Sequence, residues 1–165
     1  MKAFFAGSFN PFTIGHLDLV ARALAICPEG VVIGVGYNLH KGDQLHTQER
    51  VEHLRKLFEQ VPHVEVIAYS GLTVDAAARA GAGVLLRGFR NAIDAEYERN
   101  LAAANRLVAD IDTIMLPCRP ELSPISSSMV RELKHNGRDV SQFLPTHAQC
   151  LDACVPAAFK STTHK

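Results

Sequence analysis

The sequence predicts an α/β fold, a doubly wound five-stranded parallel sheet with helices on both faces. Two observations support this prediction. Five short apolar runs recur along the chain, and each is brief enough for a buried strand. Stretches with helical periodicity separate these runs. Because parallel strands are joined through crossover helices, the alternation favours a parallel sheet.

The predicted strands are the five apolar runs, taken in chain order. They cover residues 2–6, 31–35, 64–68, 83–86 and 113–116. With 165 residues, the chain has the length of one domain that can bury a sizeable core. We therefore expect a single domain over residues 1–165, with a frayed tail at residues 158–165.

Helices are predicted between and after these strands. In the first, Leu17, Val20 and Leu24 share one face, because they are three and four residues apart. Thr47 is the expected N-cap of the second helix, with Glu49 in its first turn. The remaining helices are expected at residues 73–80, 94–109, from about 126 onwards, and at 147–158.

Composition argues against several classes of protein. Lys plus Arg and Asp plus Glu both number 17, whereas a non-specific nucleic-acid or membrane binder normally has a basic excess. No apolar stretch has the length of a membrane span and no signal peptide is recognisable, so a cytoplasmic location is expected. The four cysteines match no zinc or redox spacing. We expect free thiols and no metal site built from protein side chains.

The first strand is followed by an informative stretch. In folds of this class, ligands bind beyond the carboxyl ends of the strands. Gly7 and Ser8 are small residues at such an end, where a ligand can approach the backbone, and His16 stands in the first turn of the next helix. A histidine at a helix N-terminus can donate a hydrogen bond to a phosphate oxygen. A tight turn with a capping histidine explains these residues equally well.

Basic residues follow two other strands. Lys41 lies in a polar loop after the second strand, although a loop lysine alone is more often a solvated surface charge. Arg87 and Arg90 follow the fourth strand, and guanidinium groups suit bidentate phosphate recognition. Asp94 and Glu98 come next at helical spacing, where they can instead hold the arginines in a network. We expect both roles to be divided among these four residues.

Three consecutive serines open the fifth helix. Ser126 suits an N-cap, but Ser127 and Ser128 exceed what a cap needs. Together they predict a phosphate cradle of hydroxyls and free backbone N–H groups. The chain contains no glycine-rich phosphate-binding motif. We therefore expect two helix N-termini, at His16 and at Ser126, to hold nucleotide phosphates.

Several stretches, in this order, resemble one known family. Residues 13–16, Thr-Ile-Gly-His, resemble the [HT]-x-G-H signature of the nucleotidylyltransferase superfamily, and ISSS at residues 125–128 resembles its serine-rich motif. RGFR at residues 87–90, DAEYE at 94–98 and FLP at 143–145 are similar to the bacterial phosphopantetheine adenylyltransferases. The resemblance extends from residue 3 to about residue 145 and implies a Rossmann-like nucleotidylyltransferase fold.

This resemblance implies a reaction and a set of site residues. Members of the family transfer the adenylyl group of ATP to 4′-phosphopantetheine, giving dephospho-coenzyme A and pyrophosphate. By position, the implied catalytic residues are His16, Lys41 and Ser8. The implied substrate-binding residues are Ser8, Lys41, Thr73 and Arg87. The implied ATP-binding residues are Ser8, Phe9, His16, Gly88, Phe89, Arg90, Glu98, Leu122, Ser123, Pro124, Ile125, Ser126, Ser127 and Ser128.

The implied chemistry needs no catalytic triad. A phosphate monoester is already anionic at neutral pH, so positioning and electrostatic stabilisation suffice for in-line displacement. Mg²⁺ is expected as a cofactor, bound mainly through substrate phosphates. The partners implied by the resemblance are ATP, 4′-phosphopantetheine and further copies of the chain in a homohexamer.

Two other functions stay open on the sequence alone. Nicotinamide-mononucleotide adenylyltransferases share the GSFNP type of stretch found at residues 7–11, but they are usually longer and lack the block at residues 87–98. A non-catalytic nucleotide-binding regulator would use the same pockets. Binding alone, however, would not require both His16 and Lys41.

Overall fold

The structure is a computed structural model that describes residues 1–38 and 44–155. In these residues, five strands form one parallel sheet in the order β3-β2-β1-β4-β5. The strands are β1 (Lys2–Gly7), β2 (Gly30–Gly36), β3 (Val64–Tyr69), β4 (Val84–Phe89) and β5 (Asp112–Pro117). They coincide with the five apolar runs, which confirms the predicted doubly wound sheet.

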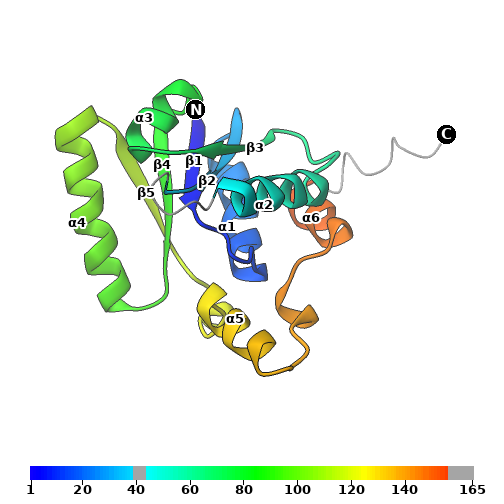
Figure 1. The fold of residues 1–165 in the computed structure, drawn as a ribbon. Coiled ribbons are helices and arrows are strands. Elements are labelled where there is room, and N and C mark those ends of the chain that lie inside the picture. Colours follow the sequence, from blue (N-terminus) through cyan, green and yellow to red (C-terminus); the bar gives the residue numbers. More distant parts are fainter. Residues whose placement is uncertain (39–43, 156–165) are drawn as a thin grey trace.

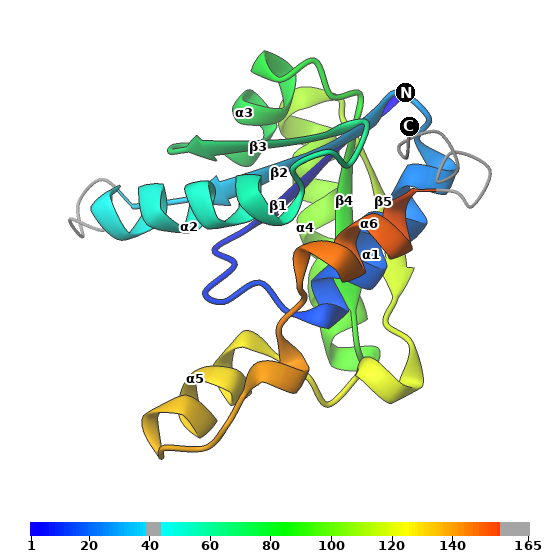
Figure 2. The ribbon, with the colours of Figure 1, turned by 90° about the vertical axis from the view of Figure 1, so that its right-hand side faces the viewer.

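Helices cover both faces of this sheet. On one face lie α1 (Ile14–Ile26), α2 (Gln44–Leu57) and α6 (His147–Cys154), and on the other lie α3 (Thr73–Arg79) and α4 (Ala92–Ala109) (Figures 1 and 2). The remaining helix, α5 (Ser127–His135), projects away from the sheet (Figure 2). None of the helices in the described part of the chain is both long and apolar enough to cross a membrane.

The central strand β1 connects two apolar cores. Successive side chains of a strand point to opposite faces. Phe5 accordingly packs with the core that includes Leu17 and Leu54, beneath α1 and α2. Its neighbour Phe4 packs with Val74, beneath α3. Both phenylalanines are buried, so β1 is covered on its two faces.

The order of the strands creates the crevice in which a ligand can bind. From β1 the chain moves through β2 to β3 at one edge, and α3 then returns it to β4 on the other side of β1. The loops after β1 and β4 therefore diverge to opposite faces of the sheet. This reversal is the switch point at which ligands bind in open α/β sheets.

Two predicted helix boundaries were wrong. Thr47 is not an N-cap, because α2 begins at Gln44, and the buried Thr47 Oγ1 accepts a hydrogen bond from Arg50 at 2.8 Å. Glutamine and leucine before Thr47 are good helix formers, so nothing delays the start of the helix. The last helix ends at Cys154, since Val155 has extended dihedral angles, and residues 156–158 of the predicted helix lie outside the described part of the chain. Val155 precedes a proline in the sequence, and that position disfavours the helical conformation.

Candidate active site

A cavity of about 790 Å³ opens at the switch point, beyond the carboxyl ends of β1 and β4. Its walls come mainly from the β1–α1 connection, the β4–α4 connection and the start of α5, and the end of β5 adds one residue. The predicted site residues that line it are Ser8, Phe9, His16, Arg87, Gly88, Phe89, Arg90, Glu98, Ile125, Ser126, Ser127 and Ser128. The fold thus brings most of the predicted residues together.

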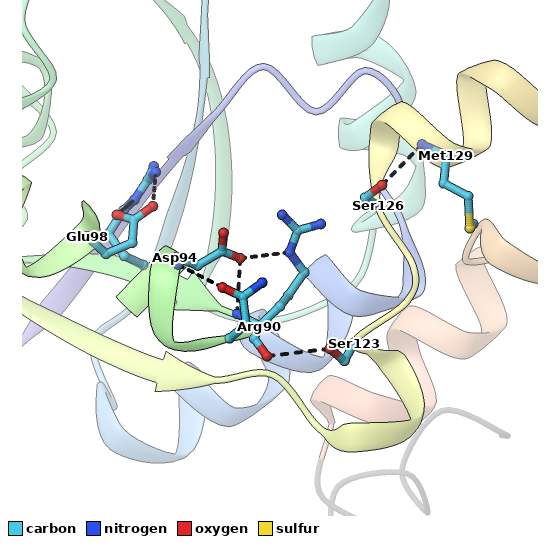
Figure 3. A network of polar contacts seen from close by, with 8 residues as sticks. Arg90, Asp94, Glu98, Ser123, Ser126 and Met129 are labelled. Carbon is cyan, nitrogen blue, oxygen red and sulfur yellow. Dashed lines mark hydrogen bonds and ion pairs between the residues drawn. The ribbon is translucent and has the colours of Figure 1, made fainter. Parts of the chain in front are cut away.

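The other predicted site residues do not line this cavity. Leu122, Ser123 and Pro124 belong to the turn before α5, where Ser123 Oγ lies 3.5 Å from the carbonyl oxygen of Arg90 (Figure 3). Thr73 lines a second cavity nearby. Lys41 lies outside the residues that the structure describes.

Gly7 makes room for a side chain of the protein itself. A Cβ atom at this position would lie 2.9 Å from the ring of Phe9, which is closer than real Cβ contacts. Phe9 has a left-handed backbone conformation, with φ of 46°, and this conformation turns its buried ring back over Gly7. The ring of Phe9 therefore occupies the place of a side chain at residue 7, while Gly7 and the adjacent, exposed Ser8 both line the cavity wall.

His16 is held by Thr13 in the first turn of α1. The backbone N–H of Thr13 donates to Nδ1 of His16 at 2.9 Å, and Thr13 Oγ1 lies 3.0 Å from the same nitrogen. Because Nδ1 accepts a hydrogen bond, the proton of the neutral ring resides on Nε2. The contact with Thr13 thus fixes both the orientation and the tautomer of the imidazole.

The environment of His16 keeps its ring neutral. The ring centroids of Phe5, Phe9 and Phe12 lie 6.1, 5.2 and 5.2 Å from that of His16. Burial lowers the pKa of His16 to about 4, and the nearby Arg90 adds to this effect. The two interpretations of His16 are therefore compatible, since Nδ1 caps α1 and Nε2–H is the donor left for the cavity that the ring lines.

Arg90 is held at the cavity by a carboxylate. Its Nε donates to Asp94 Oδ2 at 2.9 Å, and Figure 3 shows the guanidinium between Asp94 and the first turn of α5. The described residues offer no hydrogen-bond partner to its two Nη groups. Arg90 thus presents a half-exposed, positively charged group to the cavity.

Arg87 forms a second and more buried pair. Its Nε and Nη2 donate to the two carboxylate oxygens of Glu98 at 2.6 and 2.7 Å, and its Nη1 donates to the carbonyl oxygen of Ala6 at 3.0 Å. The side chain of Glu98 is only 9% exposed. These pairs confirm that the two carboxylates after β4 hold the two arginines in a network.

The serine hydroxyls at the start of α5 have structural partners. Ser126 Oγ accepts the backbone N–H of Met129 at 3.1 Å, which makes it the N-cap (Figure 3). The hydroxyl of Ser127 donates to the carbonyl oxygen of Pro11 at 2.7 Å. The cap is as predicted, whereas no pattern in the sequence indicates the contact with Pro11, 116 residues away.

An arginine of α5 completes this attachment. Arg131 donates to Ser128 Oγ at 3.2 Å and to the carbonyl oxygen of Asn10 at 2.6 Å. The Ser126 cap uses the N–H of Met129, whereas among the described residues no acceptor contacts the N–H groups of Ser127 and Ser128, which remain for an anion in the cavity. The predicted cradle is therefore one of backbone N–H groups more than of hydroxyls.

The cavity offers few ligands to a metal ion. Its carboxylates, Asp94 and Glu98, are both paired with arginines. Among the described residues, no group of three His, Cys, Asp or Glu side chains is placed to hold a metal. Mg²⁺ prefers oxygen ligands and keeps several of its waters. This donor set fits Mg²⁺ as a companion of substrate phosphates.

Sequence reasoning missed some residues of the cavity. Thr13 is one, and its position as the first residue of the Thr-Ile-Gly-His stretch was the sequence feature that could have identified it. Cys118 also lines the cavity, and its position directly after β5 follows the same rule that pointed to the other strand ends. Burial raises the pKa of the Cys118 thiol, which therefore stays protonated at neutral pH.

The second cavity adjoins the first and is more apolar. It has a volume of about 280 Å³, and Leu85, Leu101 and Thr73 are among the residues that line it. The hydroxyls of Thr73 and Tyr69 lie 2.9 Å apart. Ala6 and Arg87 line both cavities, so Arg87 marks the junction between them.

Comparisons with known proteins agree with this geometry. Residues 4–133 match the family described as cytidylyltransferase-like. A phosphopantetheine adenylyltransferase from Porphyromonas gingivalis is 50% identical over 143 residues, which cover 87% of this chain and 93% of the relative. Another from Phocaeicola vulgatus is 49% identical over 144 residues, covering 87% and 95%.

Among solved structures, a protein of unknown function from Archaeoglobus fulgidus is similar in fold. The TM-score is 0.52 at 14% sequence identity, and the likeness covers 76% of this chain and 95% of that one. It supports the Rossmann-like arrangement of the sheet.

Proposed function

This chain belongs to the phosphopantetheine adenylyltransferases, within the cytidylyltransferase-like family, and we propose that it transfers the adenylyl group of ATP to 4′-phosphopantetheine. The products are dephospho-coenzyme A and pyrophosphate, in the biosynthesis of coenzyme A. The observation that carries the proposal is the convergence of two helix N-termini and two arginines on one cavity. Such a cavity suits a reaction between two polyanions.

In the proposed mechanism, an oxygen of the acceptor phosphate attacks the α-phosphorus of ATP in line. The bond from this phosphorus to the bridging oxygen breaks, and pyrophosphate leaves. The attacking oxygen is already anionic, so the mechanism requires no general base. His16 donates its Nε2–H to an α-phosphate oxygen as negative charge accumulates there. Its low pKa of about 4 keeps this neutral donor in place throughout the physiological pH range.

ATP occupies the larger cavity in this proposal. Its phosphates meet the N–H groups at the start of α5 and the Nη groups of Arg90. The backbone after β1 and β4 encloses the rest of the nucleotide, which engages Phe9, Gly88 and Phe89. Residues 122–124 support this wall from the turn before α5.

The acceptor spans the junction of the two cavities. Lys41 and Arg87 bind its phosphate and Ser8 contacts both reacting phosphates, while the smaller, apolar cavity with Thr73 takes the pantetheine arm. The support for this placement is that Arg87 lines both cavities. Mg²⁺, when bound to the substrate phosphates, offsets part of their negative charge.

We also propose that the chain is a single domain that assembles as a homohexamer in the cytoplasm. The family resemblance is the source of that number. In support of assembly, α4 exposes the large apolar side chains of Ile93, Tyr97, Leu107 and Val108, at 82%, 64%, 88% and 67%. All four cysteines are free thiols, as is usual in a reducing compartment.

One assay tests the proposed reaction against its rivals. The protein is incubated with ATP, Mg²⁺ and either 4′-phosphopantetheine or nicotinamide mononucleotide, and pyrophosphate release is followed. We expect release with 4′-phosphopantetheine. Release with nicotinamide mononucleotide alone would overturn the proposal in favour of the related adenylyltransferase. No release with either acceptor would favour a nucleotide-binding regulator.

A further inference from the structure

Glu98 is one of two carboxylates in the cavity, and its charge has the wrong sign for a phosphate site. It lies on α4 like the other, Asp94, but is more buried, with 9% of its side chain exposed against 29% for Asp94. Glu98 is the buried residue of α4, with 7% of its surface exposed. A carboxylate so placed would repel a triphosphate unless another charge neutralises it.

Arg87 supplies that neutralising charge. Both carboxylate oxygens of Glu98 are bound in a bidentate pair, at 2.6 and 2.7 Å, and the two side chains lie on different elements, α4 and β4. A bidentate pair of this kind fixes the plane of the guanidinium as well as its position. The hydrogen bond to Glu98 raises the pKa of Arg87 above its usual value, so the guanidinium is permanently charged.

A third contact ties the guanidinium to the central strand. Nη1 of Arg87 donates to the carbonyl oxygen of Ala6 at 3.0 Å, at the end of β1. A guanidinium has five N–H donors, and three are used by Glu98 and Ala6. In residues 1–38 and 44–155, no acceptor contacts the remaining N–H on each of Nη1 and Nη2. These two donors are available at the point where the two cavities meet.

From this geometry we infer that Glu98 is a positioning residue, which holds the free donors of Arg87 toward the phosphate monoester of the acceptor. Glu98 therefore acts through Arg87 and is not itself a ligand of the nucleotide. This role rests on the proposed function, since it needs an acceptor phosphate at the junction. It replaces the nucleotide-binding role that the family resemblance implies for Glu98.

The substitution Glu98→Gln tests this inference. One arm of the amide can still accept from Arg87, whereas the other is a donor and disrupts the bidentate pair. We expect KM for 4′-phosphopantetheine to rise about tenfold or more, as a charge-assisted hydrogen bond is lost. The dissociation constant of ATP, measured by calorimetry, should change less than about threefold. Glu96→Gln on the exposed side of α4 is the matched control and should leave both constants unchanged.

A double variant separates the two possible roles of Glu98. If Glu98 acts through Arg87, then Arg87→Lys alone should raise the same KM, and adding Glu98→Gln to it should have little further effect. A nucleotide ligand would behave differently. The inference would be overturned if Glu98→Gln bound ATP more weakly and if the increases in KM from the two single substitutions multiplied in the double variant.

Two further measurements keep the outcome interpretable. Should Glu98→Gln fail to fold, Glu98→Asp retains the charge but withdraws it by one methylene, and the same rise in KM is expected. Turnover of the wild-type chain is measured first. If that chain releases no pyrophosphate with 4′-phosphopantetheine, the proposed function has failed. If the wild type is active and KM is unchanged in the folded variant, only the role of Glu98 has failed.

Discussion

At the scale of single residues, His16 combines a structural contact with the role in the reaction that we propose for it. Its Nδ1 accepts the Thr13 N–H and so satisfies a free donor at the start of α1. The same contact leaves the proton on Nε2, in a ring that is surrounded by three phenylalanines. Capping and phosphate contact use different nitrogens, so they do not compete.

The substitution His16→Ala should affect catalysis more than binding. We expect kcat to fall about 10²- to 10³-fold, as when one donor to a developing oxyanion is removed. The dissociation constant of ATP should rise less than about tenfold, because the donor acts mainly in the transition state. Steady-state kinetics and calorimetry measure the two effects, with His135→Ala on exposed α5 as the control. If the fold decrease in kcat and the fold increase in the dissociation constant of ATP were equal, His16 would be only a ground-state ligand.

The low pKa of His16 also predicts a dependence of stability on pH. The folded pKa of about 4 lies below the ordinary value of 6.5, so the unfolded chain binds more protons between these values. The stability that His16 contributes by staying neutral is fully present above pH 6.5. It is lost as the pH falls toward 4, which lowers the free energy of unfolding by up to about 3 kcal/mol. Urea unfolding at pH 7 and pH 4.5 measures it. His16→Gln cannot titrate there, so a loss as large as in the wild type would contradict this prediction.

At the scale of elements, the site depends on how closely helices approach the sheet. Helix α1 lies against β4 at Gly88, where a Cβ atom would stand 2.3 Å from Leu19 Cδ1. Helix α5 is tied to the loop after β1 through Ser127 and Arg131. Both contacts bring a helix N-terminus to the same cavity.

Gly88→Ala should therefore loosen the packing of α1 on β4. We expect the free energy of unfolding to fall by about 1–3 kcal/mol, the usual range for overpacking a core. Leu19→Ala removes the clashing methyl groups, so the double variant should be more stable than the sum of the two single losses predicts. Urea titration of the four proteins measures the coupling. Strictly additive losses would mean that Leu19 is not the group that Gly88 accommodates.

At the scale of the whole molecule, a zero net charge coexists with a cationic site. The 17 basic and 17 acidic residues balance overall, but the cavity brings arginines and two helix N-termini to one place. Its two carboxylates are neutralised by pairing with Arg87 and Arg90. Total charge thus says little about a site for polyanions.

Assembly is the second property of the whole molecule that can be tested. Leu107 on α4 is 88% exposed and lines neither of the two cavities described above. Leu107→Glu places a charge on this apolar face, so we expect a shift from the proposed hexamer to smaller species, because burying a charge is costly. Light scattering after size exclusion measures the mass. Leu45→Glu, an exposed leucine of α2, is the control. An unchanged hexamer would show that α4 is not at the interface.

The sequence by itself determined the elements of the fold. Apolar runs and helical spacing report which faces are buried, and these patterns are local, so they predicted the strands and their parallel arrangement. The helix ends at Gln44 and Cys154 differ from the predicted ones because the residues before Thr47 favour a helix and Val155 precedes a proline. The rule that ligands bind after strands also located Ser8, Arg87 and Arg90 without a structure.

Only the tertiary structure decided what these residues touch. The ring of Phe9 packs over Gly7. Ser127 on α5 donates a hydrogen bond to Pro11, and Glu98 forms an ion pair with Arg87. Side-chain partners depend on how segments far apart in the chain approach one another to within a few ångströms. Periodicity carries no record of such approaches, so it located the strand ends around the cavity but not the side-chain contacts made there.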